Sequence, residues 1–100
     1  MAREFLNADP RTLHLPPSRA EGADPEKLQR QIAKHGTNTE GMPPLWVHRG
    51  KDGELMVMDG VTRATRIAKL LPGQVVPIEV TREVPNKDFA KLPTVEEKLP

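Results

Sequence analysis

A run of apolar residues that leads directly into a helical pattern constrains the fold of this chain most. Residues 55–58, Leu-Met-Val-Met, are typical of a strand buried on both faces, and we therefore expect this strand in the middle of a sheet. Asp59-Gly60 interrupts the run, and residues 61–71 then carry apolar side chains at helical spacing until a Pro-Gly pair ends the pattern. A strand followed at once by a helix predicts a sheet with a helix packed against it.

The predicted helix 61–71 has one apolar face and one polar face. Arg63 falls at the border of the two, whereas Arg66 is expected to point outward. The apolar face consists of Val61, Ala64, Ile67, Ala68 and Leu71, and the polar face of Thr62, Thr65, Arg66 and Lys69.

A second helix is predicted over residues 24–36. Asp24 is a good N-cap, the proline after it fits the first turn, and Gly36 fits a left-handed stop. The apolar stripe of this helix is narrow, with Leu28 and Ile32 at its centre, so we expect the helix to lie on the surface of the domain.

Three further strands complete the expected sheet. Residues 45–49 and 55–58 flank a turn with an Asp-Gly signal, which predicts a hairpin. Alternating apolar residues predict a last strand at 76–80 and a first strand around 12–15. The resulting order, β-α-β-β-α-β, predicts an α+β fold in which a small mixed β-sheet carries two helices.

The division of the chain follows from its composition. Only 36% of the residues are hydrophobic and three are aromatic, so the core must be thin and mostly aliphatic. We expect one domain over residues 1–84. Prolines cluster after it, and residues 85–100 are expected to form a Pro-rich C-terminal arm that either packs on the domain or serves a protein partner.

Composition also excludes several classes of function. The absence of cysteine removes disulfides, thiolate nucleophiles and thiolate metal sites. A net charge of +1 predicts no nonspecific nucleic-acid binding by overall charge and leaves a local basic patch open. No apolar run approaches the roughly 20 residues of a membrane span, and the first residues lack the apolar stretch of a signal peptide, so we expect no membrane partner.

The turn between residues 59 and 63 has the properties of an anion-binding site. The first turn of a helix presents free N–H groups and the positive end of its dipole, and Gly60 lets a ligand approach the backbone closely. Thr62 adds a hydroxyl group and Arg63 a planar cation suited to phosphate. The alternative is structural: the stem of Arg63 lies along the core rim while its head pairs with a carboxylate.

Residues 56–68, Met-Val-Met-Asp-Gly-Val-Thr-Arg-Ala-Thr-Arg-Ile-Ala, resemble the second motif of the ParB/sulfiredoxin superfamily. In that family a strand runs into Asp-Gly or Gly-Gly, two variable residues, an arginine and an Ala-rich helix. Residues 13–19 resemble its opening strand and Pro-rich loop ending in arginine, residues 24–36 its following helix, and residues 43–47 its proline-led second strand. The resemblance covers residue 13 to about residue 80 and implies the ParB/sulfiredoxin fold.

The resemblance implies that Gly60 and Arg63 bind nucleotide phosphates, with Thr62 nearby and Arg19 as a second phosphate ligand. Sulfiredoxins carry their catalytic cysteine where Val61 stands, so reductase chemistry is excluded. Many ParB proteins carry an acid at that position and a base at Thr62, so this chain departs from the pattern expected for nucleotide hydrolysis. The helix-turn-helix and dimerisation regions of partition proteins have no counterpart in these 100 residues.

A looser resemblance connects the segment Asp59–Arg66 with ParB-like domains of bacterial secreted effectors and toxins, some of which are described as nucleases. It implies a cytoplasmic protein, or one delivered into a target cell as part of a larger effector. The expected function is a nucleotide- or nucleic-acid-phosphate-binding domain with nuclease or NTPase activity, in which Asp59 recruits Mg²⁺ together with the nucleotide. The alternative is a non-enzymatic protein-interaction module.

For several other candidate residues the sequence leaves two roles open. Asn38 and Thr39, in the polar loop after the first helix, contact a base or ribose or are solvated, and Arg66 is an auxiliary phosphate ligand if it faces the site. Trp46 stacks on a base or packs in the core. His48 and Glu54 form either an acid–base pair or an exposed cross-strand pair.

We expect no metal site made of histidines. His14, His35 and His48 lie on three different elements, and no pair has the helical i, i+4 spacing of a zinc site.

Overall fold

Strong local signals at their ends delimit both helices of the computed structural model, which describes residues 4–100. The Asp24 carboxylate accepts hydrogen bonds from the backbone N–H groups of Glu26 and Lys27 at the start of α1 (Pro25–His35), and Gly36 follows its last turn. Helix α2 (Val61–Leu70) begins directly after Gly60. Both helices are confirmed.

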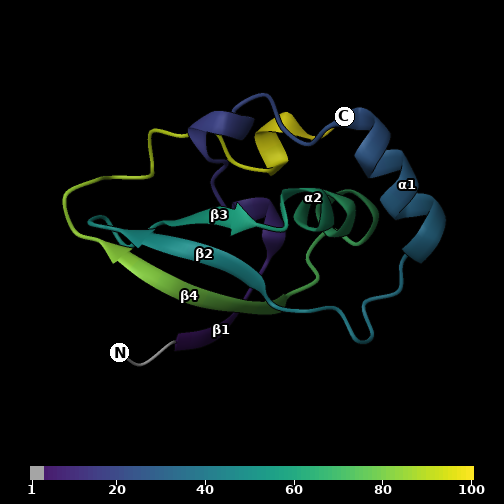
Figure 1. Ribbon diagram of the computed structural model, residues 1–100, viewed down its shortest axis with the longest axis horizontal. Coiled ribbons are helices and arrows are strands. Elements are labelled where there is room, and N and C mark those ends of the chain that lie inside the picture. The colour runs from purple at the N-terminus through teal and green to yellow at the C-terminus, as the bar shows by residue number, and fades with distance from the viewer. Residues whose placement is uncertain (1–3) are drawn as a thin grey trace.

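The strands form one mixed sheet (Figure 1). Its spatial order is β1-β4-β2-β3, with β4 parallel to β2 and the other two neighbouring pairs antiparallel. The predicted α+β class, a small mixed sheet with two helices, is confirmed. The strands are β1 (Glu4–Ala8), β2 (Leu45–Gly50), β3 (Leu55–Asp59) and β4 (Val76–Val84), and the short 3-10 turns are η1 (Pro10–Thr12), η2 (Pro17–Arg19) and η3 (Glu96–Lys98).

The position of the first strand was predicted wrongly. β1 lies at Glu4–Ala8, whereas residues 12–15 pair with the sheet only through isolated bridges at His14. The side chains of Leu13 and Leu15 are buried in the core, so their alternation reflects burial rather than a continuous strand. The prolines on both sides of this segment, which lack the N–H group of a ladder, keep it short.

The hairpin β2–β3 is confirmed, but its expected central position is wrong for β3, which lies at the edge of the four-stranded sheet. His14 covers this edge: its N–H donates to the carbonyl of Leu55 at 2.8 Å, and its carbonyl accepts from the N–H of Val57 at 2.9 Å. This partner explains why an edge strand has Met56 and Val57 buried.

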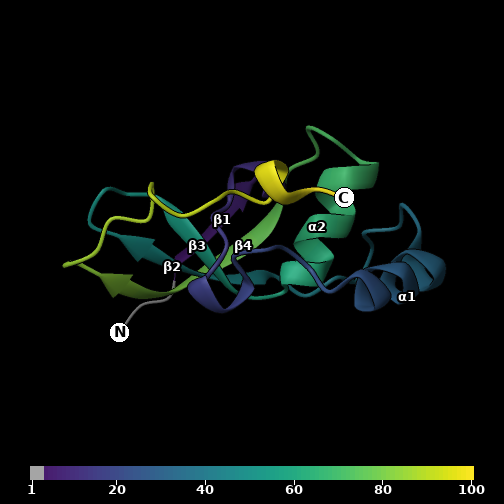
Figure 2. The same ribbon diagram turned by 90° about the horizontal axis from the view of Figure 1, so that it is seen from above.

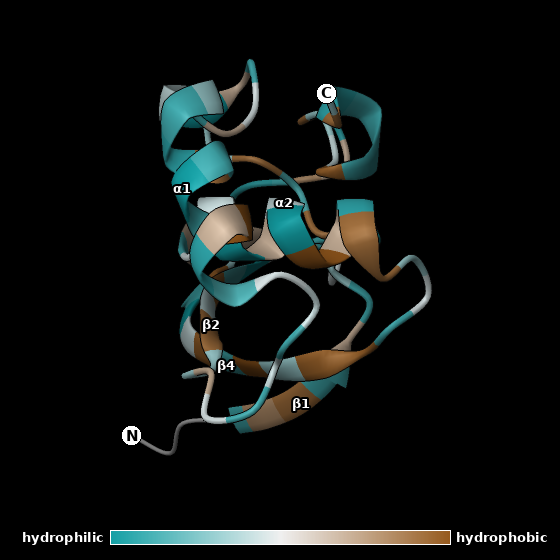
Figure 3. Cartoon of the chain, turned by 90° about the vertical axis from the view of Figure 1, so that its right-hand side faces the viewer, coloured by the Kyte–Doolittle hydropathy of each residue, from teal (hydrophilic) through white to brown (hydrophobic). Residues whose placement is uncertain are grey.

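The core lies between the sheet, α2 and the segments around Leu13 and Val95. Helix α2 lies between the sheet and α1 when the molecule is seen from above (Figure 2). Helix α1 is mostly hydrophilic (Figure 3), and Leu28 is its buried residue. The core cluster consists of Leu13, Leu15, Leu45, Val47, Val57, Ala64, Ile67, Ala68, Val76, Ile78, Val80 and Val95.

Residues 85–100 pack on the domain, which is one of the two roles left open for this arm. Val95 belongs to the core, and its N–H donates to the carbonyl of Leu13 at 2.8 Å. Thr94 and Glu97 exchange the reciprocal hydrogen bonds of a capping box. The arm therefore contributes to the same folding unit as the sheet.

We expect Val95→Ala to lower the free energy of unfolding by about 2 kcal/mol, because it removes buried methyl groups and leaves a cavity. Urea denaturation followed by Trp46 fluorescence measures the change. Val75→Ala, at an exposed valine, is the matched control and should change stability by less than about 0.5 kcal/mol. An equal effect of the two substitutions would contradict the core role of the arm.

Candidate functional site

The turn between β3 and α2 is built around Gly60. Its φ of 104° lies in the left-handed region that favours glycine. An added Cβ would lie 2.6 Å from Leu45 Cδ2, so the position also demands the absence of a side chain. No side chain caps α2, and its first hydrogen bond runs from the N–H of Ala64 to the carbonyl of Gly60. The N–H groups of the first turn have no acceptor within the helix and are free to face a ligand.

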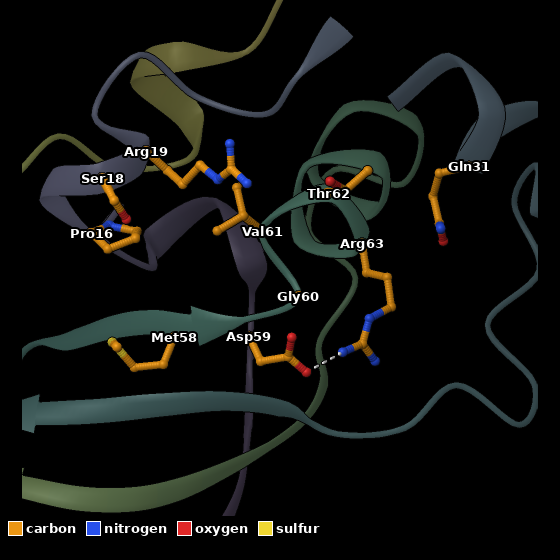
Figure 4. Close-up of a pocket in the computed structure, with 10 residues that line it drawn as sticks. All are labelled: Pro16, Ser18, Arg19, Gln31, Met58, Asp59, Gly60, Val61, Thr62 and Arg63. Atoms are coloured by element: carbon orange, nitrogen blue, oxygen red, sulfur yellow. Dashed lines mark hydrogen bonds and ion pairs between the residues drawn. The ribbon is translucent and has the colours of Figure 1, made fainter. Parts of the chain in front are cut away.

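A pocket of about 480 Å³ opens beside this turn (Figure 4). It brings together residues from η2, from the end of β3 and the start of α2, and from α1. Five predicted site residues line it: Arg19, Asp59, Gly60, Thr62 and Arg63. Its remaining lining residues are Pro16, Ser18, Gln31, Met58 and Val61.

Arg63 already has partners in the protein. Its Nη1 donates to the carbonyl of Pro43 at 2.9 Å, and its Nη2 lies 3.3 Å from Asp59 Oδ2. The structural alternative predicted for Arg63, pairing with a carboxylate, is therefore present. The Asp59 side chain is 64% exposed and that of Arg63 19%, so water weakens this ion pair.

Arg19 differs from Arg63 in having no such partner. It is exposed at the end of η2, and its guanidinium makes no hydrogen bond or ion pair with residues 4–100. In Figure 4 the side chains of Arg19 and Arg63 lie on either side of the chain at Gly60 and Val61. Arg19 is thus a cation at the pocket whose donors are available.

Arg66 faces away from the pocket, and the prediction that it points outward is wrong. Its side chain is 1% exposed, and Nη1 donates to the carbonyls of Gly36 at 2.6 Å and Asn38 at 3.0 Å. Burial lowers the pKa of Arg66. Neither Asn38 nor Thr39 lines the pocket; Arg66 instead ties their loop to α2.

The polar side of α2 was misjudged because α1 covers it. Thr65 is buried as well as Arg66, and its hydroxyl donates to the carbonyl of Val61. The narrow apolar stripe of α1 indicated this packing, because a helix with such a stripe must bury it against another element, here α2.

The predictions for the pair of His48 and Glu54 and for the packing of Trp46 are also corrected. Glu54 pairs with His14, at 2.9 Å between Nε2 and Oε1, and not with His48, which stands opposite Met56 in the hairpin. His14 Nδ1 donates to the carbonyl of Leu92 at 2.8 Å and so connects the hairpin to the C-terminal arm. Trp46 is 45% exposed, so it does not pack in the core.

Over residues 4–100, no cluster of three or more His, Asp or Glu side chains is arranged to hold a metal ion. Within the same residues, no helix is long and apolar enough to cross a membrane.

Comparison with known proteins gives no match: no family model, no curated protein and no solved structure is significantly similar to this chain.

Proposed function

We propose that the pocket at the β3–α2 turn binds the phosphate of a nucleotide or nucleic acid. One observation carries the proposal: a single pocket gathers the unpartnered Arg19, the guanidinium of Arg63, the Thr62 hydroxyl and the uncapped start of α2. Free helix N–H groups and the helix dipole favour an anion, and arginine donors match the geometry of phosphate oxygens. The ParB-like pattern of residues 56–68 supports the same ligand class.

Asp59 is the one carboxylate among the lining residues, so its negative charge opposes the binding of an anion. Its Oδ2 lies 3.3 Å from Nη2 of Arg63. A phosphate would compete with it for Nη2 of Arg63, whereas Mg²⁺ carried by the nucleotide would relieve the repulsion by taking an oxygen of Asp59 as a ligand. Magnesium is therefore expected to strengthen binding.

We propose that this pocket binds its ligand without hydrolysing it. The lining residues include no histidine or lysine, and Val61, at the first position of α2, offers neither a nucleophile nor a base. A nuclease or NTPase activity would need a water activated by Asp59 or by its metal ion. A role within a bacterial effector belongs to the same proposal and rests on the resemblance of the segment Asp59–Arg66 alone.

A protein-interaction module is the second candidate, and the sheet supports it. Strand register aligns Phe5, Glu79, Trp46 and Asp59 in one row across the four strands. Phe5 and Trp46 are exposed in this row, and exposed aromatic side chains are enriched in protein interfaces. This candidate predicts no response to nucleotides.

The test is the thermal stability of the protein with ATP, CTP, GTP or a short single-stranded DNA, each with and without Mg²⁺. A ligand at ten times its dissociation constant should stabilise the fold by about 1.4 kcal/mol and raise Tm by about 5–11 °C. Arg19→Ala should weaken binding about tenfold, because it removes charge-assisted hydrogen bonds to phosphate.

Arg19→Ala is the cleanest variant, since its guanidinium has no partner to lose and its stability should stay within about 0.5 kcal/mol of wild type. Arg63→Ala should weaken binding at least as much, with some loss of stability from the contacts to Pro43 and Asp59. Lys51→Ala, at an exposed cation in the hairpin turn, is the control and should bind like wild type. No rise in Tm with any ligand, or a rise kept in both arginine variants, would refute the phosphate site.

A further inference from the structure

A second cavity, of about 560 Å³, lies where the chain after β4 passes the hairpin end of the sheet. It shares no lining residue with the phosphate pocket. The sheet contributes His48, Met56, Arg82 and Val84, and the C-terminal arm contributes Asn86, Lys87, Asp88, Phe89, Lys91 and Leu92, with Pro17 of η2 at the side.

The arm is fixed in place over this cavity by several independent contacts. The N–H of Lys51 donates to the carbonyl of Lys87 at 2.7 Å, and the N–H of Ala90 donates to Asp52 Oδ2 at 2.9 Å. Phe89 is buried against Gly50, where an added Cβ would lie 3.0 Å from its ring and 2.7 Å from the carbonyl oxygen of Lys87. These contacts preform the cavity, so a ligand would not need to order the arm.

Part of the cavity lining is apolar, and most of its charged lining residues are positive. Met56, Val84, Phe89 and Leu92 supply apolar surface. Arg82, Lys87 and Lys91 supply three cations against the single carboxylate of Asp88. None of these four charged side chains makes an ion pair or a side-chain hydrogen bond within residues 4–100.

His48 adds a neutral polar group to the same wall. Burial and the neighbouring charge of Arg82 lower the pKa of its imidazole, which favours the neutral ring with one donor and one acceptor. Together with the Asn86 amide, it provides hydrogen bonds that orient a polar head without adding charge.

We propose that this cavity binds a small organic carboxylate with an apolar body. The three cations would hold the carboxylate, and the apolar lining residues would cover the hydrocarbon. Small-molecule sites combine a mostly apolar lining with a few convergent polar groups in this way, and the volume lies within their usual range of about 300–1,000 Å³. Inorganic phosphate or acetate would not cover the apolar lining residues, and a neutral alcohol would leave the cations unpaired.

The test is a titration of the ¹⁵N-labelled protein at pH 7 with three probes: octanoate, acetate and 1-octanol. Octanoate should give saturable shifts of the amide signals of residues 48, 56, 82–84 and 86–92. Acetate and 1-octanol should bind about tenfold more weakly or worse, since each lacks one half of the recognition. The imidazole pKa of His48 should rise on saturation with octanoate, because a bound anion stabilises the protonated ring.

The double variant Arg82→Gln/Lys91→Gln keeps the fold, since both side chains are exposed, and should bind octanoate about tenfold more weakly while 1-octanol is unaffected. Arg30→Gln on α1 is the matched control and should bind octanoate like wild type. Octanoate that binds no more tightly than 1-octanol, or with equal affinity in the double variant, would refute the proposal. So would an unchanged His48 pKa at saturation.

Discussion

Replacing Arg66 by alanine is expected to lower the free energy of unfolding by about 3 kcal/mol. The substitution empties the volume of a fully buried side chain and leaves a cavity between α2 and the loop after α1. It also removes the donors to the carbonyls of Gly36, which is half-buried, and Asn38, which is exposed, so water replaces part of these hydrogen bonds and their loss costs about 1 kcal/mol. Loss of the desolvation cost of the guanidinium offsets part of this sum. For a domain of this size the melting temperature should fall by about 12–24 °C.

Two further variants separate the causes. Arg66→Met keeps most of the volume and removes the donors, so its stability should lie between those of wild type and Arg66→Ala. Arg30→Ala removes an arginine with a 70% exposed side chain from α1 and should change stability by less than about 0.5 kcal/mol. Equilibrium urea denaturation measures all three. An Arg66→Ala protein within 1 kcal/mol of wild type would mean that the loop does not depend on Arg66.

Arg66 also shows where sequence reasoning about this fold reached its limit. Features that depend on neighbours in sequence were predicted correctly: the Asp24 cap and Gly36 stop of α1, and the hairpin between β2 and β3. Features that depend on distant partners were not. β1 carries no strong pattern and exists because it pairs with β4, and Arg66 is buried because α1 and its following loop cover that side of α2.

The two candidate sites also differ in whether they depend on sequence neighbours or on distant parts of the chain. The residues of the β3–α2 turn were predictable as a group, because a strand, a glycine and a helix start fix their mutual positions. Arg19 joins them in the pocket through the fold of η2. The second cavity was not predictable, because it exists only after residues 86–92 fold back over the sheet and anchor at Asp52 and Gly50.

Gly60→Ala is expected to destabilise the protein by about 2–5 kcal/mol, through two separate costs. The φ of 104° is unfavourable for a residue with a side chain and costs about 1–2 kcal/mol. The added Cβ would also lie 2.6 Å from Leu45 Cδ2, and Leu45 is fully buried in the core, so its methyl group can move only if neighbouring core side chains shift. Overpacking of this kind costs a further 1–3 kcal/mol or so.

Gly53→Ala is the matched control, because Gly53 also has a left-handed φ, of 81°, but an added Cβ would meet no atom within 4 Å. It should cost about 1–2 kcal/mol, the conformational part alone. The difference between the two variants therefore isolates the steric cost, which comes mainly from Leu45, because the other close group, the guanidinium of Arg63 with Nη2 at 3.0 Å, ends a flexible side chain. Urea denaturation gives this difference, and equal losses in the two variants would show that Leu45 yields and that the turn is held by backbone conformation only. A larger loss at Gly60 would mean that core packing fixes the backbone position at which we propose a phosphate to bind.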